Sequence, residues 1–171
     1  GSGKSTLTAA FHDRGYPVVT DDISVVAFDR DGHPMIHPGY RHLRLAEDSL
    51  EHVGMSLGAR RKLDLGKQKY GVAVPGAAPQ APLRIRQMFL LTSRPAETIG
   101  LRRLDGSAKV TAVVRGTYRR RMSVALGRRS DHFAQCVAVG RRIQIVAVDR
   151  RRDLGSLGQL VDALEDELRG A

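Results

Sequence analysis

The sequence predicts a single α/β domain, residues 1–171, with a central mixed sheet and flanking helices. Three observations predict this fold class. The chain has 171 residues, 42% of them hydrophobic, so it is long enough for one sizeable core and too short for two comfortable domains. Apolar runs with strand character alternate with segments of helical spacing. The chain also opens with the order glycine-containing turn, helix, strand, which is typical of α/β proteins.

The first third is expected to hold a helix, a strand, a hairpin, a loop and a short helix. Helical spacing of apolar residues ahead of Gly15, a common helix-ending residue type, indicates the first helix. Asp31 and Gly32 between two apolar runs indicate the hairpin. In chain order these elements are placed at residues 5–14, 16–20, 23–28 with 34–37, 38–45 and 46–57.

The remainder is expected to contain four strands and three helices. Alternation in LRIRQ predicts a strand with one face in water, whereas the apolar run IQIVAVD predicts a buried strand. The last helix is amphipathic. The strands are placed at 67–74, 83–92, 98–104 and 143–149, and the helices at 107–118, 130–139 and 157–168.

The opening hexapeptide, GSGKST, matches the end of a phosphate loop, G-x-x-x-x-G-K-[ST]. In such loops backbone N–H groups wrap phosphates, the lysine reaches the terminal ones, and the hydroxyl ligates Mg²⁺. Gly3, Lys4 and Ser5 supply the last three fixed positions. The first fixed glycine would precede residue 1, so the chain is expected to begin inside the motif. The alternative is a flexible end that happens to contain these residues.

Two adjacent carboxylates, Asp21 and Asp22, follow the predicted strand 16–20. A helix of about ten residues is roughly 15 Å long, so this strand would return parallel and end beside the loop, where ligands bind in α/β sheets. One Asp could then hold Mg²⁺ and the other accept a proton from an attacking hydroxyl. Irregular backbone is needed to turn both inward, and a solvated turn is the alternative.

The segments GSGKST, RGYPVVTDD, PGYRHLRLAEDS and KQKYGV together resemble the carboxy-terminal catalytic domain of HPr kinase/phosphorylase and its shorter serine-kinase relatives. The similarity continues more weakly over LRIRQMFLL and VVRGTYR, so it covers nearly the whole chain. It implies a phosphate-loop fold related to phosphoenolpyruvate carboxykinase. It also implies transfer of phosphate from ATP, with Mg²⁺, to a serine hydroxyl of a protein or peptide. Some short relatives accompany ribosomal-peptide pathways, including lasso-peptide clusters, and modify a precursor peptide.

The resemblance also implies residue roles. Asp21 is the expected base and Asp22 the metal partner, although these two roles could be exchanged, and Lys4 completes the catalytic set. ATP phosphates are expected to contact Gly1, Ser2, Gly3, Lys4, Ser5 and Thr6, and Mg²⁺ to contact Ser5 and Asp22. Arg41, Arg44 and Lys67 are candidates for gripping phosphate oxygens, with surface solvation as the alternative. Residues 1–171 contain no RG-x-G signature of the full-length regulator, and its amino-terminal domain is not expected here, which weakens HPr as the substrate and the reverse phosphorylase reaction.

Positive charge favours an anionic partner. Lys and Arg number 28 against 18 Asp and Glu, which gives a formal net charge of +10. Aromatic residues are only 5% of the chain and do not interleave with the arginine clusters, so an acidic protein or peptide is expected ahead of nucleic acid. Two alternatives to a serine kinase stay open: a small-molecule phosphate-loop kinase, and a basic nucleic-acid or protein-binding module with a degenerate nucleotide site.

Other residues add less. His33, His37 and His42 with Asp31 and Asp48 share no helix face, so a metal site is not expected there. The single cysteine cannot form an internal disulfide, and no apolar run approaches the roughly 18 residues of a membrane span. A cytoplasmic protein without membrane contact is therefore expected, and a homo-oligomer is left open.

Overall fold

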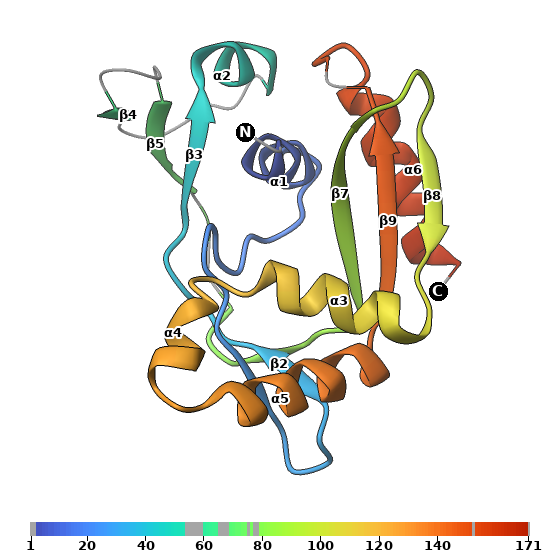
Figure 1. Ribbon diagram of the computed structural model, residues 1–171. Coiled ribbons are helices and arrows are strands. Elements are labelled where there is room, and N and C mark those ends of the chain that lie inside the picture. The colour runs from blue at the N-terminus through green and yellow to red at the C-terminus, as the bar shows by residue number, and fades with distance from the viewer. Residues whose placement is uncertain are drawn as a thin grey trace.

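The computed structural model describes residues 3–53, 60–64, 69–74, 76, 79–151 and 153–170, and these residues form a mixed α/β structure (Figure 1). Within this part of the chain there are six helices and three sheets of three strands each. None of these helices combines the length and apolarity needed to cross a bilayer. In chain order the elements are α1 (Lys4–Asp13), β1 (Val26–Phe28), β2 (Pro34–Ile36), β3 (His42–Ala46), α2 (Glu47–Val53), β4 (Arg60–Asp64), β5 (Lys69–Ala73), β6 (Leu83–Arg84), β7 (Gln87–Pro95), β8 (Gly100–Arg103), α3 (Gly106–Gly116), α4 (Arg121–Ala125), α5 (Arg129–Arg142), β9 (Gln144–Arg150) and α6 (Leu157–Arg169).

Helices cover both faces of the sheet β7-β9-β8. This sheet is mixed, because β9 pairs in parallel with β7 and antiparallel with β8. Successive residues of a strand point to opposite faces. Accordingly, Val148 belongs to a buried cluster with Leu7 of α1 and Leu164 of α6, whereas Ile145 belongs to a second cluster with Ala112 of α3. α3 also contacts α5. The three layers are therefore α1 with α6, the sheet, and α3 with α5.

The sheet β3-β5-β4 lies on the other side of α1 (Figure 1). Both pairings in this sheet are antiparallel. Leu43 and Leu45 of β3 are buried in the same cluster as α1, while Arg44 between them is exposed. Arg14, just after α1, makes an ion pair with Asp162 of α6 at 2.7 Å. The first helix is therefore held between two sheets and tied to the last helix.

The third sheet contains the expected hairpin. β1 pairs with β2, and β2 also pairs with β6. Gly32 has a φ of 76°, which glycine adopts without strain, and Asp29 Oδ1 accepts backbone N–H bonds from Asp31 at 3.0 Å and His33 at 2.7 Å. The His33 bond is the main cause that lowers the pKa of Asp29.

Strongly periodic elements are confirmed. The helix expected over 5–14 is α1, the helices expected over 107–118, 130–139 and 157–168 are α3, α5 and α6, and the buried strand expected over 143–149 is β9. The short helix expected over 46–57 is present as α2, and residues 54–57 lie outside the described part. The strand expected over 98–104 is present as β8, and the strand expected over 67–74 is present as β5. Residues 67 and 68 lie outside the described part.

The strand expected over 16–20 is wrong, and with it the parallel return of the chain. These residues are irregular, and their apolar character is explained by burial of Val18 in the core. Pro17 has no N–H to donate to a ladder. The expected loop 38–45 instead contains β3, and the expected strand 83–92 is divided into β6 and β7. The short elements β4 and α4 were not expected. The central mixed sheet is present only in part: β7-β9-β8 is mixed and lies between helices, but the other described strands form two separate sheets.

Replacing Leu164 with alanine is expected to lower the free energy of unfolding by about 2–5 kcal/mol, because its side chain is 0% exposed and leaves a cavity between α6 and the sheet. The measurement is urea unfolding followed by circular dichroism. Leu168→Ala on the same helix is the matched control, since Leu168 is 40% exposed and should cost less than about 1 kcal/mol. Equal losses in both variants would contradict the placement of the core.

Candidate functional site

The predicted phosphate turn leads directly into α1. Gly3 is the residue that precedes the helix, with a left-handed φ of 75°, and its carbonyl accepts the first helical bond from the Leu7 N–H at 3.0 Å. The first N–H groups of a helix have no partner within the helix and carry partial positive charge. Lys4 is exposed at this end. Gly1 and Ser2, also expected at the phosphates, lie outside the described residues.

A second cation, Arg150, lies against the turn. A Cβ atom added to Gly3 would stand 2.5 Å from Arg150 Nη2, so the guanidinium occupies the space beside the glycine. Arg150 is the last residue of β9 and shares a strand face with Val148, which faces α1. Asp149 is on the opposite face, where its Oδ1 accepts a 2.6 Å bond from the Thr92 hydroxyl.

Arg150 was missed as a site residue from the sequence. In the sequence, Arg150 belongs to an arginine cluster that indicates only net positive charge. A usable signal was present, because Arg150 follows a buried strand directly, and the carboxyl ends of parallel strands are where ligands bind in α/β proteins.

Thr6 has a structural contact. Its hydroxyl donates to Ser49 Oγ at 3.1 Å, and Ser49, in α2, is buried. The Ser49 backbone N–H donates to the Asp48 carboxylate at 2.8 Å. The Thr6 side chain thus joins α1 to α2, and only its backbone remains as a candidate for phosphate contact.

The two adjacent carboxylates stand in a tight turn. The Ile23 N–H donates to the Asp21 carbonyl at 2.7 Å, and Asp22 between them has a φ of 62°. A non-glycine residue in this conformation is strained, and such strain collects at functional sites. The Asp21 N–H donates to the Tyr40 carbonyl at 3.0 Å, which fixes the turn to the segment before β3. The backbone at the acidic pair is therefore irregular, as the predicted joint role of the two carboxylates requires.

The two carboxylates have different surroundings. Asp21 Oδ2 is buried and has no hydrogen-bond partner among the described residues. Asp22 is exposed, and its Oδ2 lies 3.3 Å from Arg44 Nη1 of β3. An exposed ion pair of this kind contributes only about 0.2–1 kcal/mol, so either partner can exchange it for a ligand at little cost.

The candidates for phosphate gripping are not all available. Arg44 pairs with Asp22, whereas Arg41 Nη1 donates to the Gly76 carbonyl at 2.9 Å, after β5. Lys67 lies outside the described residues. α1 packs on the face of β3 that carries Leu43 and Leu45, whereas Arg44, which pairs with Asp22, points to the opposite face. The helix of the phosphate turn and the acidic pair therefore attach to the same strand from different faces.

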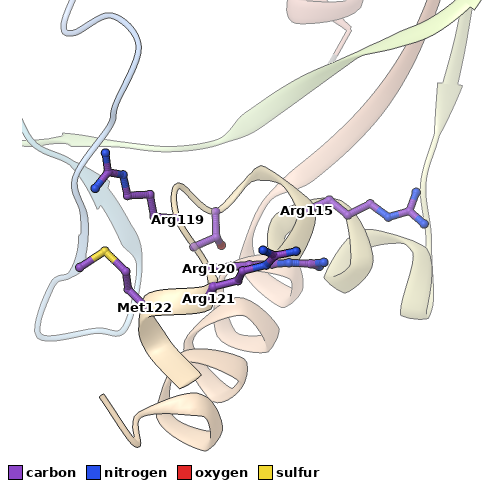
Figure 2. A pocket seen from close by; sticks show the side chains of 6 residues that line it. Arg115, Arg119, Arg120, Arg121 and Met122 are labelled. Carbon is purple, nitrogen blue, oxygen red and sulfur yellow. The ribbon is translucent and has the colours of Figure 1, made fainter. Parts of the chain in front are cut away.

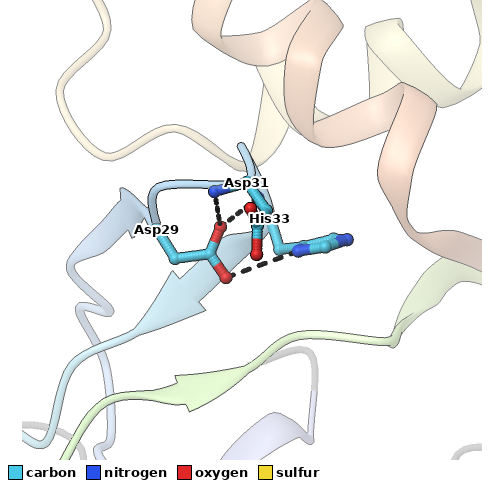
Figure 3. A group of neighbouring side chains, drawn as sticks. All are labelled: Asp29, Asp31 and His33. Carbon is cyan, nitrogen blue, oxygen red and sulfur yellow. Dashed lines mark hydrogen bonds and ion pairs between the residues drawn. The ribbon is translucent and has the colours of Figure 1, made fainter.

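A small acidic cluster in the hairpin turn is explained by the turn itself. Side-chain atoms of Asp29, Asp31 and His33 that could ligate a metal ion lie within 4.8 Å of one another (Figure 3). Asp29 Oδ1 accepts the two turn N–H bonds, and its Oδ2 lies 3.4 Å from His33 Nδ1. His42 is elsewhere, stacked on Tyr40 with ring centroids 4.2 Å apart.

A second polar cluster joins α3 to α5. His132 Nε2 lies 3.0 Å from Thr117 Oγ1 and 3.4 Å from Cys136 Sγ. Burial raises the pKa of the Cys136 thiol, which disfavours the thiolate and hence nucleophilic chemistry. This cluster therefore serves helix packing.

Comparisons with models of protein families, with curated proteins and with solved structures find no match to this chain. The functional argument accordingly depends on the chain's own residues.

Proposed function

We propose that this protein is an ATP-dependent serine kinase of the HPr-kinase-like, phosphate-loop type, which transfers the γ-phosphoryl group to a serine hydroxyl of a protein or precursor peptide. The observation that carries the proposal is the start of α1. A left-handed glycine leads into the positive end of the helix, Lys4 stands in the first turn, and the Arg150 guanidinium lies against the glycine. Helix amides with adjacent cations suit phosphate oxygens.

The residues would divide the work as follows. The amides at the start of α1, Lys4 and Arg150 would hold the phosphates and offset their charge. Asp21, whose buried oxygen lacks a partner among the described residues, would accept the serine proton as the new P–O bond forms and the bond to the departing ADP oxygen breaks. Ser5 and Asp22 offer hard oxygen ligands that suit Mg²⁺, which would neutralise phosphate charge when bound. The cytoplasm, where ATP is available, is the proposed compartment.

The test uses the full-length product of the gene with radiolabelled ATP, Mg²⁺ and two sets of acceptors: serine-containing peptides and small alcohols. We expect label in the peptides as phosphoserine, and none in matched peptides with alanine in place of serine. Label in small alcohols alone would support a small-molecule kinase instead. Absence of any ATP turnover, together with salt-sensitive retention on DNA or RNA, would support a basic binding module with a degenerate site.

A further inference from the structure

A basic segment without acidic residues runs from α3 to the start of α5. Between residues 106 and 130 the chain has no Asp or Glu, and it carries these basic residues: Lys109, Arg115, Arg119, Arg120, Arg121, Arg128 and Arg129. The proposed phosphoryl transfer uses none of them. Such a segment generates a strongly positive local potential unless carboxylates from elsewhere in the fold compensate it.

Four of these arginines line one pocket, the arginine pocket. Its volume is about 650 Å³, and its lining residues are Arg115, Thr117, Arg119, Arg120, Arg121 and Met122. In Figure 2, Arg120 and Arg121 extend in the direction of α3, whereas Arg119 and Met122 project to the other side of the turn before α4. The pocket is thus larger than a single phosphate needs.

The pocket arginines have no acidic partner in the described part of the chain. None of the four makes an ion pair with a carboxylate of the described residues, whereas the nearby Arg128 pairs with Asp131 at 2.6 Å. Arg119 lies over the Tyr118 ring, 5.4 Å from its centroid, and has a φ of 45°. The turn therefore holds a cluster of like charges, whose mutual repulsion an anionic ligand would reduce.

Large exposed apolar side chains lie in the same segment and in α5, which contacts α4. Five of them are 52–69% exposed, and they are Tyr118, Met122, Val124, Leu126 and Phe133. No residue of α4 is buried. A free phosphate or nucleotide would bind the arginines and leave this apolar surface in water. A nucleic acid would also contact the arginines through its phosphates and leave most of this apolar surface in water, and Arg119 already covers one face of Tyr118, where a single-stranded base would stack.

We propose that the arginine pocket and its apolar margin bind an acidic peptide segment, with carboxylates on the arginines and apolar side chains on the Met122 side. Carboxylates match guanidinium groups in geometry as well as charge, and buried apolar anchors beside them add affinity. The inference concerns binding alone and holds whether or not the protein transfers a phosphoryl group.

The test measures fluorescence anisotropy of a labelled peptide of Glu and Leu, without nucleotide, on the full-length protein. Two competitors of equal charge are a peptide of Glu and Ser and a single-stranded oligonucleotide. We expect the Glu–Leu peptide to bind saturably and more tightly than either competitor. Absence of saturable binding, equal binding of the Glu–Ser peptide, or tighter binding of the oligonucleotide would each overturn the proposal.

Variants locate the surface. The combined substitutions Arg119→Gly, Arg120→Gln and Arg121→Gln should weaken the Glu–Leu peptide about tenfold or more; glycine at 119 preserves the turn. Arg84→Gln, Arg86→Gln and Arg102→Gln remove the same charge from residues outside the pocket lining and should change binding less than about twofold. A loss of equal size in this control would show attraction to overall charge only, and would overturn the proposal. Met122→Ser should weaken binding of the Glu–Leu peptide more than binding of the Glu–Ser peptide.

Discussion

Lys4→Ala is expected to reduce phosphoryl transfer by about a hundredfold to a thousandfold, the typical cost of losing one preorganised charge-stabilising group. Lys4 stands in the first turn of α1, where its ammonium would reach the phosphate oxygens that gain charge in the transition state. The measurement is the steady-state rate of peptide phosphorylation at saturating ATP. Because Lys4 is exposed, its loss should leave the unfolding midpoint nearly unchanged.

Thr8→Ala is the matched control for Lys4→Ala. Thr8 lies one turn further along α1, and its hydroxyl donates to the Lys4 carbonyl at 3.0 Å, so the substitution alters the same helix without removing charge. We expect its transfer rate to stay within about twofold of the original, as for surface substitutions away from a site. Undiminished transfer by Lys4→Ala would contradict the phosphate role of the opening turn.

Asp21→Asn is expected to lower the turnover number by about a hundredfold to ten-thousandfold, the usual contribution of a general base. Asparagine keeps the size of the side chain but cannot accept the serine proton. The buried Oδ2 has no hydrogen-bond partner among the described residues, so neutralising this side chain should not destabilise the fold. The two measurements are turnover number and thermal unfolding, made on the same preparation.

Asp31→Asn provides the control for Asp21→Asn, because Asp31 is an exposed carboxylate in the hairpin turn. Its turnover should be unchanged. If Asp21→Asn retained full turnover with an unchanged fold, Asp21 would not be the base. The same pair of measurements on Asp22→Asn would then test the exchanged assignment of the two aspartates.

The parts of the fold that the sequence predicts are those with a local cause. The spacing of Leu157, Leu160, Val161 and Leu164 specifies one apolar helix face, and the unbroken run before Asp149 specifies a buried strand. β3 depends instead on pairing with β5, distant in the chain, and the proline and glycine before it made a loop the simpler interpretation. Likewise, residues 16–20 have the apolar composition of a strand because Val18 is buried in the core, although their backbone is irregular.

For the candidate site, residue types were predictable but their pairings were not. The sequence identifies Gly3, Lys4 and the two aspartates as a set suited to phosphate and Mg²⁺. It does not reveal that Thr6 bonds to Ser49 or that Asp22 pairs with Arg44. These contacts depend on how α1, α2 and β3 pack, which is a property of the tertiary structure.

The contact between Gly3 and Arg150 has a consequence for the newly synthesised chain. Its two partners lie far apart in the sequence, and α1 also packs on α6, which follows β9 along the chain. A ribosome must therefore synthesise and release the chain as far as Arg150 before the opening turn acquires its arginine neighbour. Any ligand that requires both groups can be captured only after β9 has emerged, so a nascent chain stalled before residue 150 should be unable to retain it.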